Sequence, residues 1–253
     1  MRKLLYVSDN FLGYNYELEE SDFIFLGIPY SVQINSSSIY APVIVRESLK
    51  YLEWKENFKV CDLGDIEVVP WNFKETSRRI KETIREIRKI TDSFIFFIGG
   101  DHLITLPIAE SLKPKTILQL DAHSDMREEY LGEKYTHATW AYQASKKFEI
   151  AQIGVRSLSK NEKSSVIKIE EIKYLKEPIY LSIDIDVFDP QYIKTGLPVS
   201  NGLNPSQIFK IIDKLKNKKV IGMDIVEISD NSLPSNTGFL AGEIIQKYME
   251  TFK

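Results

Sequence analysis

The chain has 253 residues, of which 43% are apolar and 27% are charged, so it can build the core of one large globular domain or of two small ones. Its formal net charge of -3 leaves no basic surface for a phosphate backbone, which excludes nucleic acid from the expected partners. One cysteine, Cys61, cannot form an intramolecular disulfide, and no apolar run approaches the ~20 residues of a membrane span, so we expect a cytoplasmic protein that does not enter the membrane.

Apolar runs and segments with helical periodicity alternate along the chain. In chain order, we predict a strand at 22–29, a helix at 42–52, a strand at 58–63, a helix at 73–90, a strand at 93–98, a helix at 105–112, strands at 116–120, 148–155 and 179–185, a helix at 205–215, a strand at 220–226 and a helix at 236–249. The clearest helical pattern lies at 73–90, where Asn72 can cap the first turn and isoleucines recur every three or four residues. This alternation predicts an α/β protein.

The predicted strands are apolar almost throughout, which is typical of a parallel sheet that helices cover on both faces. The pattern fits both an open, doubly wound sheet and a closed barrel. In either fold the carboxyl ends of the strands gather at one edge, so we expect polar residues that follow the strands to lie close together. No linker, internal repeat or composition break divides the chain, and we therefore expect a single domain over residues 1–253.

Two carboxylates and an imidazole follow the strand predicted at 116–120. Alternate side chains share a face in extended backbone, so Asp121, His123 and Asp125 could converge on one metal ion. Taken alone, the same stretch could equally well form a helix cap and a turn that bind no metal. The other strand ends therefore decide between these interpretations.

Two further strand ends carry the same kinds of side chain. Gly99 and Gly100 precede His102, which taken alone is more typical of a turn than of a metal ligand. Asp184 and Asp186 end another strand on one face, where two carboxylates repel each other unless a cation or a proton intervenes. The pair of aspartates therefore indicates a cation site, and His102 becomes a candidate ligand only in combination with the other strand ends.

The three strand ends together supply six candidate metal ligands: His102, Asp121, His123, Asp125, Asp184 and Asp186. Six ligands exceed the needs of one tetrahedral zinc ion, and a set dominated by oxygen suits harder ions such as Mn²⁺. We therefore expect a pair of ions. Such a pair lies about 3.5–4 Å apart and lowers the pKa of water from about 15.7 towards about 7, which supplies hydroxide at neutral pH and predicts a hydrolase.

Glu227 and His137 complete the candidate site. Glu227 follows the strand at 220–226, and its carboxylate could accept a bidentate hydrogen bond from a guanidinium, although an exposed glutamate after a strand is common. His137 lies just beyond the loop at 126–136, where its imidazole could transfer a proton to a leaving group. All three histidines of the chain thus fall at or near the candidate site.

Four motifs in this order resemble the signatures of the ureohydrolase family, which includes arginases and agmatinases: GGDH at 99–102, DAHSD at 121–125, SIDIDVFDP at 182–190 and the glutamate of DIVE at 227. Weaker similarities at 26–29, at Arg46 and at 153–157 extend the resemblance over most of the chain. The resemblance implies an arginase-like, three-layer α/β/α fold with a mostly parallel central sheet. It also implies a homo-oligomer, a trimer or a hexamer.

The resemblance further implies a role for each candidate residue. One Mn²⁺ ion is expected on His102, Asp121, Asp125 and Asp184, and a second on Asp121, His123, Asp184 and Asp186. Asp125 is also expected to orient the hydroxide, Glu227 to hold the guanidinium, and His137 to relay protons. The implied products are urea and an amine.

The implied substrate is a small cationic guanidino compound, and the loop before His137 indicates agmatine. This loop lacks the serine and asparagine residues of arginases, and its acids Glu128, Glu129 and Glu133 favour the terminal ammonium of agmatine unless they only solvate the loop. We therefore predict hydrolysis of agmatine to putrescine and urea, a step of polyamine biosynthesis. Arginine and other guanidino or formimino compounds remain alternatives, as do a phosphoesterase that uses the same ions and a non-catalytic metal-binding protein.

Three positions depart from the pattern of the family. Ala138 follows the loop histidine where glycine is usual, Leu197 takes the place of threonine in a G-T-P sequence, and 38–40 replaces a Gly-Ala-Arg segment. These departures affect the expected shape of the substrate pocket and leave the six candidate ligands unchanged.

Overall fold

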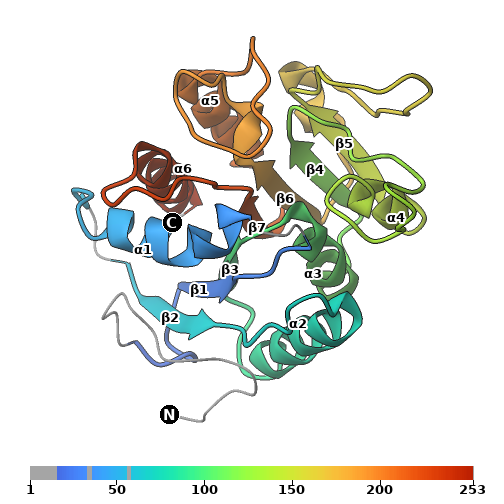
Figure 1. Ribbon diagram of the computed structural model, residues 1–253. Helices are drawn as coiled ribbons and strands as arrows, with labels where there is room; N and C mark the ends of the chain where they lie inside the picture. The colour runs from blue at the N-terminus through green and yellow to red at the C-terminus, as the bar shows by residue number, and fades with distance from the viewer. Residues whose placement is uncertain (1–15, 33–35, 56–57, 253) are drawn as a thin grey trace.

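Seven parallel strands form one open sheet in the computed structural model, which describes residues 16–32, 36–55 and 58–252. The strands are β1 (Phe23–Ile28), β2 (Val60–Asp65), β3 (Phe94–Gly99), β4 (Thr116–Leu120), β5 (Glu149–Ile153), β6 (Ile179–Asp184) and β7 (Val220–Val226). They pair in the order β2-β1-β3-β7-β6-β4-β5 (Figure 1). The parallel α/β prediction is confirmed, and because β2 and β5 are edge strands, the barrel alternative is wrong.

Helices cover both faces of the sheet, which gives the predicted three layers (Figure 1). One face packs against α1 (Ala41–Leu49), α5 (Pro205–Leu215) and α6 (Asn236–Phe252). The other packs against α2 (Phe73–Arg88), α3 (Thr105–Leu112) and α4 (Trp140–Ser145). The short helix α4 was not predicted, because six residues are too few to show a periodic pattern. No helix in the described part of the chain is both long enough and apolar enough to cross a membrane.

The local signals for α2 act as expected. The side chain of Asn72 accepts a hydrogen bond from the backbone N–H of Glu75 at 3.1 Å and so caps the first turn. Ile80, Ile84 and Ile87 are buried on the face that packs against the sheet. Burial of each such side chain contributes about 1.5–3 kcal/mol, which holds the helix in place.

The order of the strands in the sheet, more than their order in the sequence, decides which candidate functional residues lie close together. β3, β7, β6 and β4 are consecutive neighbours in the sheet, although β3 and β7 are more than a hundred residues apart in the chain. All strands run in the same direction, so their carboxyl ends lie at one edge. Each of the four strands leads directly into one of the polar motifs.

Candidate functional site

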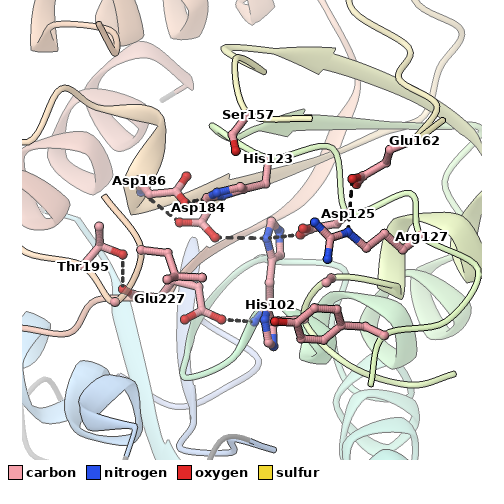
Figure 2. Close-up of a pocket in the computed structure, with 15 residues that line it drawn as sticks. His102, His123, Asp125, Arg127, Ser157, Glu162, Asp184, Asp186, Thr195 and Glu227 are labelled. Atoms are coloured by element: carbon pink, nitrogen blue, oxygen red, sulfur yellow. Dashed lines mark hydrogen bonds and ion pairs between the residues drawn. The ribbon is translucent and has the colours of Figure 1, made fainter. Parts of the chain in front are cut away.

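The four central strands deliver their polar residues to one cavity of about 150 Å³ (Figure 2). His102 begins the short 3-10 helix η2 (His102–Ile104) after β3, and the stretch from Asp121 follows β4. Asp184 ends β6, and Glu227 follows β7. A Cβ atom on Gly100 would lie 2.3 Å from the backbone oxygen of Tyr30, so only glycine permits this close entry to His102.

One group of donors surrounds the ring of His102, which is fully buried. Its Nδ1 lies 3.1 Å from Oδ2 of Asp121, 3.3 Å from Oδ2 of Asp125 and 3.3 Å from Oδ2 of Asp184. This Nδ1 makes no hydrogen bond to any described residue. A buried ring nitrogen without a hydrogen bond, facing three carboxylates that repel one another, has the chemistry of a divalent cation site.

A second group shares Asp121 with the first. The Nδ1 of His123 lies 2.8 Å from Oδ2 of Asp186 and 3.7 Å from Oδ1 of Asp121. The donor atoms of His102, Asp121 and Asp184, and likewise those of Asp121, His123 and Asp186, all lie within 4.8 Å of one another. This arrangement offers two adjacent candidate cation positions with a common carboxylate, and Asp125 joins the first group through its distance to His102.

The backbone brings these side chains together by turns, and the expected extended geometry is wrong. Asp125 has a positive φ of 53°, so it does not continue an extended strand from Asp121. β6 ends at Asp184, whose side chain accepts a hydrogen bond from the backbone N–H of Asp186 at 2.8 Å and caps the 3-10 helix η4 (Ile185–Val187). Glu227 also has a positive φ, of 63°. Such a conformation costs a non-glycine residue about 1–3 kcal/mol and is concentrated at functional sites.

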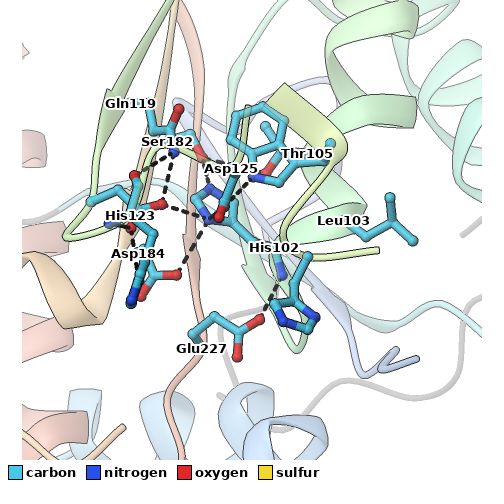
Figure 3. Close-up of polar contacts among 12 residues, drawn as sticks. His102, Leu103, Thr105, Gln119, His123, Asp125, Ser182, Asp184 and Glu227 are labelled. Carbon is cyan, nitrogen blue, oxygen red and sulfur yellow. Dashed lines mark hydrogen bonds and ion pairs between the residues drawn. The ribbon is translucent and has the colours of Figure 1, made fainter. Parts of the chain in front are cut away.

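Several buried residues that sequence reasoning missed orient the candidate ligands. The indole Nε1 of Trp140 donates to Oδ2 of Asp125 at 2.8 Å, and the amide of Gln119 donates to Oδ2 of Asp121 at 2.8 Å. The hydroxyl of Ser182 lies 2.9 Å from Nε2 of His102 (Figure 3). The signal was present, because Gln119 and Ser182 are polar residues inside otherwise apolar strands, where each needs a buried partner.

Sequence reasoning also missed a charged pair in the cavity wall, formed by Arg127 and Glu162. The Nε of Arg127 donates to Oε2 of Glu162 at 3.1 Å, and the guanidinium extends towards Asp125 (Figure 2). Burial would raise the pKa of Glu162, but hydrogen bonds from Ser124, Ser159 and Arg127 outweigh burial and lower it. Glu162 is therefore ionised and balances the charge of Arg127.

Glu227 and His137 both line the same cavity. Oε1 of Glu227 accepts a hydrogen bond from the backbone N–H of His102 at 2.9 Å, whereas Oε2 has no hydrogen-bond donor among the described residues. Burial and the nearby charge of Asp101 raise the pKa of Glu227 well above its usual range. His137 lies edge-on to Tyr130, and its Nδ1 is 4.0 Å from Oδ2 of Asp101.

Burial and mutual repulsion make the cluster hold protons in the absence of cations. Burial, followed by the charges of Asp186 and Asp125, raises the pKa of Asp121 to about 8. Burial would lower the pKa of His123, but its hydrogen bond to Asp186 and the surrounding carboxylates raise it to about 9. For His102, too, the neighbouring carboxylates outweigh burial and raise the pKa. A bound cation would have to displace these protons.

Comparison with known sequences shows in which protein family these residues occur together. The sequence profile of the arginase family matches residues 21–250. The chain belongs to the arginase family. Enzymes of this family hydrolyse guanidino groups and have a binuclear metal centre, which agrees with two adjacent donor groups in the cavity.

Three relatives of this arginase-family protein have informative names. The agmatinase of Pyrococcus horikoshii is 30% identical over 259 residues, which cover 90% of this chain and 91% of that protein. The N(1)-aminopropylagmatine ureohydrolase of Thermococcus kodakarensis is 31% identical over 259 residues, which cover 90% of each. The crystal structure of the agmatine ureohydrolase of Thermoplasma volcanium has a TM-score of 0.85 at 27% identity and covers 97% of this chain and 94% of that one.

Proposed function

We propose that this arginase-family hydrolase is a manganese-dependent agmatinase, which converts agmatine and water to putrescine and urea. The observation that carries the proposal is a cluster of two imidazoles and four carboxylates at one cavity, beside a glutamate whose Oε2 accepts no hydrogen bond from any described residue. We further propose that residues 1–253 form one catalytic domain, which acts in the cytoplasm as part of a homotrimer or homohexamer, as the family resemblance implies.

The donor set indicates which residues would hold the ions. The first ion is assigned to His102, Asp121, Asp125 and Asp184, and the second to Asp121, His123, Asp184 and Asp186. Donors dominated by carboxylate oxygen, with one imidazole at each position, suit Mn²⁺. When bound, such a pair supplies hydroxide at neutral pH, which a poor electrophile such as a guanidinium requires.

The charges of the cavity support a guanidinium as the reacting group. The four aspartates of the cluster balance two divalent ions charge for charge, and Arg127 and Glu162 balance each other. Among the charged residues that line the cavity, Glu227 remains without a matching charge. Glu227 lines the cavity, and no described residue donates to its Oε2, so a substrate N–H can bind there; a cation at this position would lower the raised pKa of its carboxyl group.

Asp125 and His137 are assigned the proton steps. Asp125 is held by the indole of Trp140 and can orient the attacking hydroxide with its carboxylate. His137 lies at the rim of the cavity near the buried Asp101, where it can deliver a proton to the departing amine. Without that proton, an amine anion would have to leave, which is far slower.

The choice of agmatine depends on the relatives and on the loop before His137. Two of the three relatives are named for agmatine itself, and the loop lacks the serine and asparagine of arginases. The acids of that loop do not contribute, because Glu128, Glu129 and Glu133 are exposed and do not line the cavity. The structure therefore does not support these acids as a reason to favour agmatine as the substrate.

Arg127 makes a guanidino acid the second candidate substrate. Only its Nε has a hydrogen-bond partner among the described residues, and the guanidinium lines the cavity. The two remaining nitrogens could bind a carboxylate at the far end of a substrate. An assay of both substrate types therefore distinguishes the candidates.

Manganese-loaded enzyme is expected to release urea from agmatine at least ten times faster than from arginine or 4-guanidinobutyrate at equal concentration. Urea would be measured colorimetrically, and putrescine by chromatography. Faster turnover of 4-guanidinobutyrate would indicate that Arg127 binds the carboxylate end of the substrate. It would contradict the agmatine proposal. Urea from none of the three compounds would contradict it as well, and hydrolysis of p-nitrophenyl phosphate in that case would favour a phosphoesterase.

Binding of Mn²⁺ is expected to release at least one proton per chain at pH 7, and the apparent affinity should rise between pH 7 and 9. The sign follows from the raised pKa values of about 8 for Asp121 and about 9 for His123, since both groups must lose protons before they bind a cation. Calorimetric titration in buffers of different ionisation enthalpy measures the released protons. A binding enthalpy independent of the buffer would show that the cluster holds no protons to displace.

A further inference from the structure

A buried carboxylate lies behind the candidate metal site and outside the cavity. Asp224 is in the middle of β7, is fully buried, and does not line the cavity. Three hydroxyl groups donate to it, those of Tyr180 at 2.7 Å, Ser182 at 2.7 Å and Thr105 at 2.8 Å. Burial raises the pKa of Asp224, and the three donated hydrogen bonds act against this rise.

When Asp224 is ionised, the hydrogens in this network have one consistent arrangement. A carboxylate accepts hydrogen bonds and has no hydrogen to donate. Ser182 therefore donates its single hydrogen to Oδ1 of Asp224, which leaves only lone pairs on its oxygen for the Nε2 of His102 at 2.9 Å. Nε2 must then carry a hydrogen, so in the neutral ring the lone pair is on Nδ1, which lies among three aspartates.

We propose that Asp224 is a positioning residue, which acts through Ser182 to hold His102 in the tautomer whose Nδ1 faces the cation site. This inference rests on the proposed function only in requiring that the cluster binds a divalent cation. The nitrogen that a histidine offers to a metal is set by the hydrogen bond that its other nitrogen makes. Here Ser182 transmits the effect of the buried Asp224 to Nε2 of His102.

Asp224 is needed because the surroundings of Nδ1 favour the opposite arrangement. Three carboxylates lie within 3.3 Å of Nδ1 and attract a proton to it. A ring that kept its hydrogen on Nδ1 would block the cation. The bond from Nε2 to Ser182 keeps the hydrogen of the neutral ring on Nε2 and leaves Nδ1 open to a cation.

The substitution Asp224→Asn is expected to reverse the direction of the hydrogen bonds that Ser182 makes to residue 224 and to His102. Tyr180 and Thr105 both donate to Oδ2, so the amide oxygen of asparagine would take that place and its NH₂ group would face Ser182. Ser182 would then accept from the amide and donate to Nε2 of His102, which favours hydrogen on Nδ1. We expect the affinity for Mn²⁺, measured by calorimetry, to fall about 10- to 100-fold, as is typical when the partner of a metal-binding histidine is lost.

The matched control is Tyr180→Phe, which removes one donor to Oδ2 and keeps the bonds between Asp224, Ser182 and His102. It should bind Mn²⁺ within about threefold of wild type, a difference of at most about 0.7 kcal/mol. Circular dichroism and thermal unfolding check that both variants fold. Equal Mn²⁺ affinity in Asp224→Asn and wild type would overturn the positioning role.

A spectroscopic measurement on the wild-type protein tests the tautomer without any variant. In protein loaded with diamagnetic Zn²⁺, the ¹⁵N chemical shifts of His102 should show hydrogen on Nε2. Hydrogen on Nδ1, or no binding of Zn²⁺ or Mn²⁺ at all, would overturn the proposal. Metal binding with the expected tautomer but no urea from any guanidino compound would refute the proposed function and leave the role of Asp224 standing.

Discussion

The substitution Asp121→Asn is expected to reduce urea release from agmatine by about 1000-fold or more. Asp121 belongs to both donor groups and, with Asp184, is assigned to both ions, and its two oxygens lie beside His102 and His123 respectively. An amide has the same shape but carries no charge and offers a single oxygen, so it cannot bridge two cations. Without the ion pair, the pKa of water returns from about 7 towards about 15.7 and hydroxide is no longer supplied at neutral pH.

Three measurements distinguish this explanation from loss of the fold. Calorimetry and elemental analysis should show fewer than two Mn²⁺ ions per chain in Asp121→Asn, while circular dichroism stays that of wild type. The matched control is Glu129→Gln, which neutralises an exposed carboxylate outside the cavity and should retain wild-type activity. A fully active Asp121→Asn variant with two bound ions would refute the assigned metal site.

The substitution Glu227→Gln is expected to lower kcat/KM for agmatine by about 100- to 1000-fold and to leave Mn²⁺ affinity unchanged. This loss corresponds to about 3–4 kcal/mol of transition-state stabilisation. Glutamine can still accept the bond from the backbone N–H of His102, but its NH₂ group would face the N–H groups of the substrate as a second donor. Glu227 also supplies the only charge in the cavity lining that the assigned ions and the Arg127–Glu162 pair leave unbalanced.

The comparison variant is Glu227→Asp, which keeps the charge and shortens the side chain by one carbon. It should retain more activity than Glu227→Gln if the charge of the carboxylate contributes more to catalysis than its distance from the guanidinium. It should retain less activity if the distance contributes more. A fall in Mn²⁺ affinity in Glu227→Gln would show instead that Glu227 is a metal ligand. Unchanged kcat/KM would remove Glu227 from the guanidinium site.

Local sequence patterns were sufficient to predict the seven strands, the longer helices and the candidate metal ligands. Each strand is a short apolar run, and Asn72 and the isoleucines of α2 signal their roles within a few residues of chain. The histidines and aspartates were recognisable because they follow apolar runs directly. Side-chain chemistry then limited the choice, since two imidazoles and four carboxylates beside one another need a cation.

The tertiary structure alone decided how these residues meet. Sequence left an open sheet and a barrel equally acceptable, because the pairing of β3 with β7 joins segments separated by more than a hundred residues and has no local signature. It also predicted extended geometry at Asp125, where the surrounding packing holds a positive φ of 53°.

Partner choice inside the core was equally invisible in the sequence. Ser182 and Asp224 could be read as interruptions of apolar strands, and only the adjacency of β6 and β7 shows that they bond to each other and to His102. Conversely, Glu128, Glu129 and Glu133 looked like part of the substrate site and lie outside it. Sequence thus determined which chemical groups are available and which segments carry them, because hydrophobic periodicity and turn chemistry act over a few residues. The strand order and the directions of the side chains were decided by packing between distant segments, which depends on the whole fold at once.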